Sequence, residues 1–205
     1  MIAPVAPTGS PIVRVVLRVA IVVAVVLALI AVATSSRYGL RWRLITFTYQ
    51  ANLLAAAFYA WALLSPRADA RVALRGAVVL YLVVAGVIWN LFLTGHSMGY
   101  TPANLLLHIV VPVLAVTDWL LVRGQVRLRW WLPIVWLVYP AAYAVLALMV
   151  LNNAGRRAPY YFLDPGSIGA AAVAINVGVL GAGVLALGYT LTAITHLNWP
   201  ADRTR

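Results

Sequence analysis

The residues of this chain that are best suited to chemistry are a threonine and a histidine, Thr46 and His108. A threonine hydroxyl is a weak nucleophile at neutral pH and needs an adjacent base that takes its proton. A neutral imidazole is the usual base, because it gains and loses a proton near physiological pH. Together in a water-poor pocket the two side chains would attack an ester, with backbone N–H groups or asparagine side chains stabilising the oxyanion.

The composition places this pair in a membrane protein. Of the 205 residues, 64% are apolar and 9% are charged, whereas a soluble domain usually has about 25% charged residues. All basic residues are arginines that punctuate apolar runs, which indicates membrane topology and no nucleic-acid binding. The lack of cysteine excludes disulfides, thiol nucleophiles and cysteine-ligated metal. The use of arginine alone, with much alanine and valine, favours a bacterial source.

Six apolar stretches have the length of about 20 residues that a helix needs to cross the hydrocarbon core. They predict an all-α fold, a polytopic transmembrane bundle with six spans over residues 13–195. A disordered N-terminal tail over 1–12 and a polar C-terminal tail over 196–205 flank the bundle. The glycines of the sixth stretch predict close helix packing. The stretches are Val13–Ala33, Leu44–Leu64, Val72–Thr94, Ala103–Val122, Trp131–Leu151 and Gly169–Ala193.

The arginines also predict how the helices are oriented. Ten of the 15 arginines fall on one side of the predicted bundle and five on the other, and the richer side is cytoplasmic by the positive-inside rule. Both termini are then cytoplasmic, in a multi-pass protein of the cell (plasma) membrane. A cleavable signal peptide that ends near Ala33 is the competing interpretation of the first stretch, but its apolar run is at the upper limit for one.

This topology brings Thr46 and His108 to a similar depth. Thr46 lies two residues into the second stretch and His108 five residues into the fourth; both stretches run inward, so their depths differ by about 5 Å. Asn104 precedes His108 by one turn and shares its helix face. Other polar side chains near these levels predict one cavity open to the outer leaflet: Thr48, Gln50, Asn52, Asn90 and Thr94.

Asp118 does not belong to this cavity. It follows His108 by ten residues, which places it about 15 Å deeper and too far away to complete a triad. We expect it to pair with Arg123 or another arginine of the inner side in a structural role. The three histidines lack metal-ligand spacing, so neither a metal nor another cofactor is expected.

A loop rich in aromatic residues and proline, Pro159–Pro165, connects the last two stretches. Aromatic residues favour the membrane–water interface, which is one explanation of the loop. The prolines and Asp164 also indicate a rigid turn. On the outer side, this turn would form a lid over the cavity.

Three local patterns together resemble the androgen-induced protein family. The first is Trp42–Phe47, the second is the spacing of Asn104, His108 and Asp118, and the third is Tyr161–Asp164. Bacterial relatives of that family carry very similar Tyr-Phe-Leu-Asp-Pro loops. The resemblance covers roughly residues 38–166.

Members of that family are intramembrane threonine hydrolases that cleave fatty acid esters of hydroxy fatty acids. The resemblance implies Thr46 as the nucleophile, His108 as its partner and a lipid ester as the substrate. This sequence departs from the family pattern at two positions. Pro112 lies one residue nearer to the histidine, and Leu105 stands where the family has a second histidine. We expect the following residues to bind the substrate: Asn52, Asn90, Thr94, Asn104, Tyr161 and Asp164.

Two other functions compete with the hydrolase. A non-catalytic membrane protein would bind lipid or a protein partner in the same outer cavity. A small transporter is disfavoured, because no inverted repeat and no matched pair of broken helices is evident.

Overall fold

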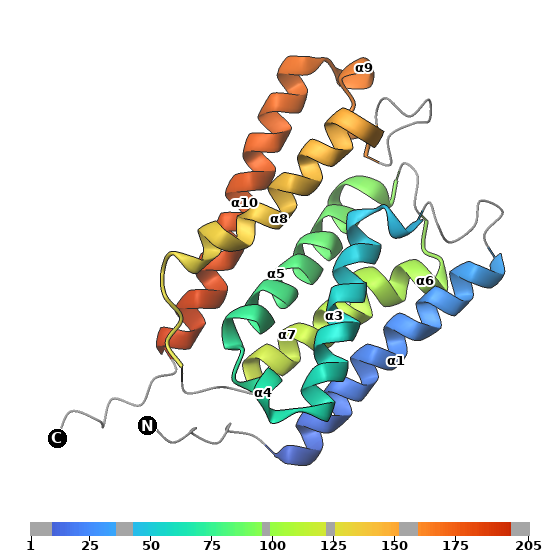
Figure 1. Ribbon diagram of the computed structural model, residues 1–205. Coiled ribbons are helices and arrows are strands. Elements are labelled where there is room, and N and C mark those ends of the chain that lie inside the picture. The colour runs from blue at the N-terminus through green and yellow to red at the C-terminus, as the bar shows by residue number, and fades with distance from the viewer. Residues whose placement is uncertain (1–9, 36–42, 96–98, 122–125, 152–159, 198–205) are drawn as a thin grey trace. The chain divides into compact units, whose positions relative to one another are not determined.

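The computed structural model describes residues 10–35, 43–95, 99–121, 126–151 and 160–197. Every regular element in these ranges is helical, which confirms the predicted all-α class (Figure 1). Each of the six apolar stretches contains a long helix. Of the predicted tails over 1–12 and 196–205, residues 1–9 and 198–205 lie outside the described residues, whereas 11–12 and 196–197 belong to the first and last helices. The long helices are α1 (Pro11–Ser35), α3 (Phe47–Leu64), α5 (Val72–Ile88), α7 (Val111–Leu121), α8 (Leu132–Leu146) and α10 (Ala170–Leu197).

Three short helices begin with the same two-residue signal, a capping side chain followed by proline. The pairs are Ser65-Pro66 before α4 (Pro66–Asp69), Thr101-Pro102 before α6 (Pro102–Leu105) and Asp164-Pro165 before α9 (Pro165–Ile168). In each case the side-chain oxygen accepts a bond from a backbone N–H of the first turn. Proline suits the first position because it has no N–H to satisfy there.

Three of the helices continue into a π-helical turn, and such turns are frequent at functional sites. The turn η1 (Trp89–Leu93) extends α5, η2 (Leu106–Val110) lies between α6 and α7, and η3 (Ala147–Leu151) extends α8. A 3₁₀ turn, η4 (Tyr161–Leu163), precedes α9.

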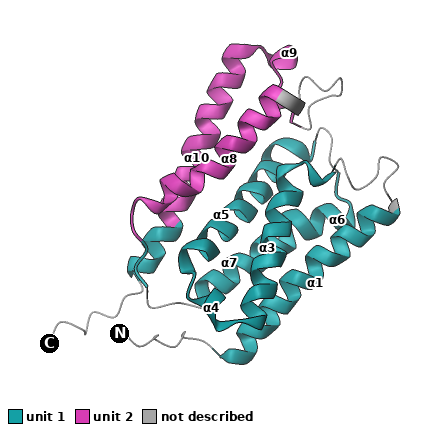
Figure 2. Ribbon diagram, viewed as in Figure 1, with its two compact units in different colours: residues 1–128, 191–205 teal, residues 129–190 magenta. Residues whose placement is uncertain are grey.

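The chain forms two compact units (Figure 2). In the first unit, residues 1–128 and 191–205, α1 packs against α3 and α7, and α5 also packs against both of these helices. Helix α3 and the continuous segment α6–η2–α7 begin at the same end of this unit and run in the same direction (Figure 1). The second unit, residues 129–190, contains α8, α9 and most of α10.

Five helical segments of the described chain are long and apolar enough to cross a membrane. The helix α3 is not among them, because Thr48, Gln50 and Asn52 lower the apolarity of its 18 residues. Large apolar side chains also face outward on these segments, for example Val113 and Ile175. Such surface suits hydrocarbon better than water, so the helices indicate a membrane protein.

Three of the four glycines of α10 do not make the close contacts that the sequence led us to expect. A Cβ atom added at Gly178, Gly181 or Gly183 would meet no atom within 4 Å. The close approach lies elsewhere, at Gly86 of α5, where an added Cβ would lie 2.6 Å from the backbone O of His108. Small residues permit close packing, but their presence alone does not identify where it occurs.

Candidate active site

His108 lies in η2, and both nitrogens of its ring have partners. Nδ1 lies 2.9 Å from the backbone O of Asn104, and Nε2 lies 3.1 Å from Oγ1 of Thr48. A carbonyl oxygen only accepts hydrogen bonds, so Nδ1 carries the hydrogen and Nε2 of the neutral ring is an acceptor. The hydroxyl of Thr48 therefore donates to Nε2.

This arrangement is the one that a hydroxyl nucleophile and its base require, since the two atoms lie within hydrogen-bond reach. Both residues are buried: Thr48 is 5% exposed and His108 is 2% exposed. Burial keeps bulk water away from the acceptor nitrogen. The chemistry open to the pair is removal of the Thr48 proton and attack by Oγ1 on an electrophile.

Thr46, which we predicted as the partner of His108, has a different contact. It occupies the N-cap position of α3 without a capping side-chain bond, and its Oγ1 donates to the backbone O of Arg43 at 2.8 Å. The predicted helix began at Leu44, whereas α3 begins at Phe47 and Thr46 has extended backbone. The hydroxyl that meets the imidazole is thus two residues further along the chain. A catalytic role of Thr46 stays a prediction.

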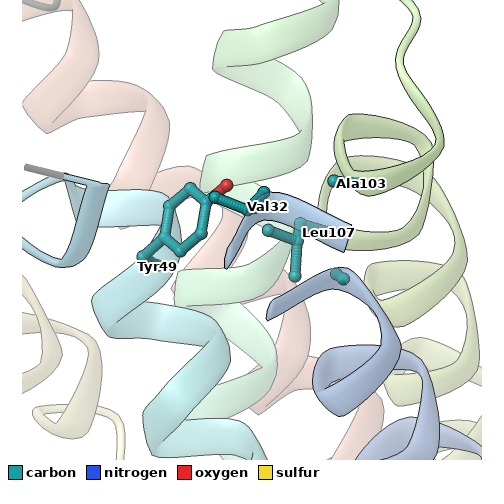
Figure 3. Packing of buried hydrophobic residues seen from close by; sticks show 5 residues of the cluster. Val32, Tyr49, Ala103 and Leu107 are labelled. Carbon is teal, nitrogen blue, oxygen red and sulfur yellow. The ribbon is translucent and has the colours of Figure 1, made fainter. Parts of the chain in front are cut away.

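A small apolar cluster joins α3 to η2 (Figure 3). Tyr49, which follows Thr48, is 1% exposed, and Leu107, which precedes His108, is fully buried. Both pack with residues of α1 and α6, namely Ala28, Val32 and Ala103. Close packing of this kind leaves the side chains little freedom, so the cluster helps to hold together the two helical segments that carry Thr48 and His108.

Two predicted binding residues, Asn52 and Asn104, position the pair. The Nδ2 of Asn52 donates to the backbone O of Thr48 at 2.8 Å and to that of Leu107 at 3.3 Å, which links the two helices. Its Oδ1 is buried without a hydrogen-bond partner among the described residues. Asn104 sets the tautomer of His108 through its carbonyl, and its own Nδ2 donates to Gly99 O.

The other predicted residues of the first unit, Asn90 and Thr94, lie on η1 and directly after it. Asn90 Nδ2 donates to Gly86 O at 2.8 Å, and Thr94 Oγ1 donates to Asn90 O at 3.3 Å. Asn90 and His108 line a groove of about 530 Å³ between α5–η1 and η2–α7. The rest of its lining is mostly apolar: Val83, Gly86, Val87, Leu91, Ile109, Pro112, Val113, Val116 and Thr117.

Tyr161 and Asp164 belong to the second unit. Asp164 caps α9, and its carboxylate accepts bonds from Gly166 N and Ser167 Oγ. Tyr161 lies edge-on to Phe162, whose backbone O accepts a bond from Asn176 Nδ2 of α10. These contacts hold the turn in place. Its predicted rigidity stays a prediction, and Pro159 lies outside the described residues. A lid role of this loop stays a prediction.

An aromatic residue that the sequence did not single out completes the site. The ring of Trp89 is stacked on the His108 imidazole, with the ring centroids 4.8 Å apart and the planes 18° from parallel. Trp89 is fully buried. It is the first residue of η1 and directly precedes Asn90. The sequence placed Asn90 at the depth of the pair. That Trp89 precedes Asn90 was the only feature of the sequence that pointed to Trp89 as part of the site.

Asp118 lies at the other end of the first unit, in a buried network of charges. Its carboxylate lies 3.5 Å from Arg18 Nε and 3.8 Å from Arg75 Nη1. Arg18 also pairs with Asp69, as does Arg14 at 3.4 Å. Arg18 and Arg75 are two of the ten arginines that the sequence predicts on the cytoplasmic side, and Arg123 lies outside the described residues.

Fold and site together define an all-helical protein of the membrane type with a buried threonine–histidine pair between two helices that run in the same direction. Comparison with protein-family models, with curated proteins and with solved structures finds no match for the chain. The resemblance to the androgen-induced protein family therefore rests on the three sequence patterns alone.

Proposed function

We propose that this protein is a multi-pass membrane hydrolase that cleaves lipid esters, with Thr48 as the nucleophile and His108 as the general base. The observation that carries the proposal is the 3.1 Å contact between Thr48 Oγ1 and His108 Nε2. The bond from Nδ1 to Asn104 O supports it, because it leaves Nε2 as the acceptor.

The reaction follows from these two contacts. His108 Nε2 takes the Thr48 proton while Oγ1 attacks the ester carbonyl, and the resulting imidazolium returns the proton to the leaving alkoxide oxygen. The acyl group is then bound to Thr48. A water molecule gives its proton to Nε2 and attacks this acyl group, which releases the carboxylic acid and restores the hydroxyl.

A membrane lipid suits the surroundings of the pair. The groove that reaches His108 is lined mostly by apolar side chains of two candidate spans, so an acyl chain is the natural occupant. The proposal includes α3 as a sixth span, because it packs between α1 and α5. It also includes cytoplasmic termini and the cell membrane, for which the arginine distribution is the support.

The nucleophile is tested by comparing two threonine variants with one probe. Purified protein in lipid nanodiscs is treated with a fluorophosphonate that reacts with activated hydroxyls. We expect wild type and Thr46→Ala to be labelled at similar rates, whereas Thr48→Ala and His108→Ala lose about 100-fold or more of the rate. The opposite pattern would return the nucleophile to Thr46, as the resemblance implies. If Thr46→Ala and Thr48→Ala are both labelled at the rate of the wild type, the proposed hydrolase is contradicted.

One observation favours a second candidate function. Both members of the pair are closed to solvent and bonded within the protein, which also suits a packing role in a non-catalytic lipid-binding protein. That candidate predicts no labelling of the wild type. It also predicts that binding of a fluorescent fatty acid survives Thr48→Val.

A further inference from the structure

The proposed reaction, on which this inference rests, places a positive charge on His108. In serine hydrolase triads a buried carboxylate stabilises this imidazolium. Here the Nδ1 partner is the neutral carbonyl of Asn104. Among the described residues no carboxylate hydrogen-bonds the ring, since Asp69 and Asp118 pair with arginines and Asp164 caps α9. The charge therefore needs another source of stabilisation.

The indole of Trp89 has the geometry to supply it. The two rings are close to parallel and their centroids lie 4.8 Å apart, within the distance of about 6 Å at which a cation over an aromatic face is attracted. Tryptophan has the strongest such face. Trp89 is fully buried and His108 is 2% exposed, so water weakens the attraction little.

The surrounding structure holds the indole in this place. Tyr100 packs edge-on against Trp89, with centroids 5.2 Å apart and planes 79° from parallel. The missing side chain of Gly86 lets α5 approach the backbone of His108. Trp89 lies one turn after Gly86 on the same helical segment, so this approach also brings the indole to the imidazole.

We propose that Trp89 is a positioning residue that stabilises the His108 imidazolium through its aromatic face, in the role that a carboxylate has in a triad. The imidazole then acts as a base beside Thr48 without an acidic third member. Asp118 has no part in this, because its partners are Arg18 and Arg75.

The test changes the charge distribution of the Trp89 indole and leaves the shape of this ring nearly unchanged. Trp89 of the full chain is replaced by tryptophans that carry one to four fluorines, which withdraw electron density from the face. We expect the rate of fluorophosphonate labelling to fall with each fluorine, by about 10- to 30-fold in total. The same series at Trp119, whose ring lies against Arg75, is the matched control and should leave the rate unchanged.

Equal rates across the Trp89 series, with the wild type labelled and Thr48→Ala unlabelled, overturn the role of Trp89 and leave the proposed function intact. A second measurement does not require the protein to react with the fluorophosphonate. In the His96→Gln/His196→Gln variant, His108 is the only histidine, and ring-nitrogen NMR reports how much of it is charged at a mildly acidic pH. Tetrafluorination of Trp89 should lower this charged fraction. An unchanged fraction overturns the inference even if no variant reacts with the probe.

Discussion

Backbone carbonyls bind most of the threonine hydroxyls in the helices of this protein, and Thr48 is an exception. A threonine inside a helix commonly donates to the carbonyl one turn earlier. Thr48 instead donates across to His108 on another helix. The threonines that follow the common pattern are Thr34, Thr94, Thr117, Thr190 and Thr195. The contact with a side chain of another helix singles out Thr48 more clearly than its residue type or its depth does.

At Gly86, the structure predicts that one added methyl group disturbs the site. A Cβ there would meet His108 O, a backbone atom, at 2.6 Å, so α5 and η2 must move apart. We expect Gly86→Ala to lower the free energy of unfolding by about 1–3 kcal/mol. Thermal unfolding in nanodiscs measures the change, and the rate of probe labelling should fall with it.

The matched control for Gly86 is Gly178 of α10, where the same substitution meets open space. Alanine is favoured over glycine inside a helix by about 0.5–1 kcal/mol, so Gly178→Ala should leave stability unchanged or raise it slightly. If both variants unfold alike, the close approach at Gly86 is not a constraint on the site.

The types of the paired side chains could be predicted from the sequence, but the identity of the threonine could not. Residue types and helix depth lead to a threonine beside His108. Selecting Thr48 over Thr46 requires the first residue of α3, and helix ends are uncertain by one or two residues. The stacking of Trp89 also depends on the close approach at Gly86, which no local pattern encodes. The resemblance implied Thr46 through the local pattern Trp42–Phe47 alone.

At the scale of helices, the arginine–aspartate network joins four elements of the first unit. Arg18 of α1 contacts Asp69 of α4 and Asp118 of α7, and Arg75 of α5 contacts Asp118. Arg18 also donates to Ala62 O at the end of α3. Ala62 lies 14 residues after Thr48 on α3, so the network and the pair are separated by about 21 Å along that helix.

This network predicts a large loss of stability when its central charge is removed. Asp118 is fully buried between two arginines, so Asp118→Asn removes the carboxylate that compensates both of their charges at that position. Breaking one partner of a buried ion pair typically costs about 3–5 kcal/mol. We expect Asp118→Asn to unfold at a markedly lower temperature than the wild type in the same nanodiscs.

Asp164→Asn provides the control with the same chemical change. Asp164 is the N-cap of α9, and asparagine caps a helix about as well as aspartate. Asp164→Asn should therefore change the free energy of unfolding by no more than about 1 kcal/mol. A small effect of Asp118→Asn as well would mean that water or another group replaces the lost charge.

The elements themselves could largely be predicted, because apolar runs of spanning length and cap–proline pairs are local signals. All six predicted stretches contain a helix. The partners of Asp118 could be narrowed to the inner-side arginines, but which ones depends on how α1 and α5 pack. The π-helical turns at Trp89 and His108 left no signal that we recognised.

At the scale of the whole molecule, the lack of cysteine makes the topology directly testable. Single cysteines are introduced by Ala3→Cys, Ala201→Cys and Gly99→Cys and probed with a maleimide that does not cross membranes. We expect the cysteine at position 99 to react in intact cells. The two terminal positions should react only after the membrane is opened, because the proposed topology places the arginine-rich side in the cytoplasm.

The same experiment distinguishes a retained first helix from a cleaved signal peptide. Helix α1 contributes the fully buried Ile21, Val25 and Ala28 and the network residue Arg18, so its removal would open the first unit. We expect the cysteine at position 3 to remain in the purified protein. Its loss, or its reaction in intact cells, contradicts the predicted topology.

The charge network also has a consequence for biogenesis. Asp118 emerges from the ribosome about 100 residues after Arg18, a delay of about 5–20 seconds at ordinary speeds of synthesis. During that interval we expect the long arginine side chains of α1 to extend toward the membrane interface, where water solvates their charges. Asp69 emerges about 50 residues after Arg18 and offers the first carboxylate, and the network is complete only when α7 has delivered Asp118.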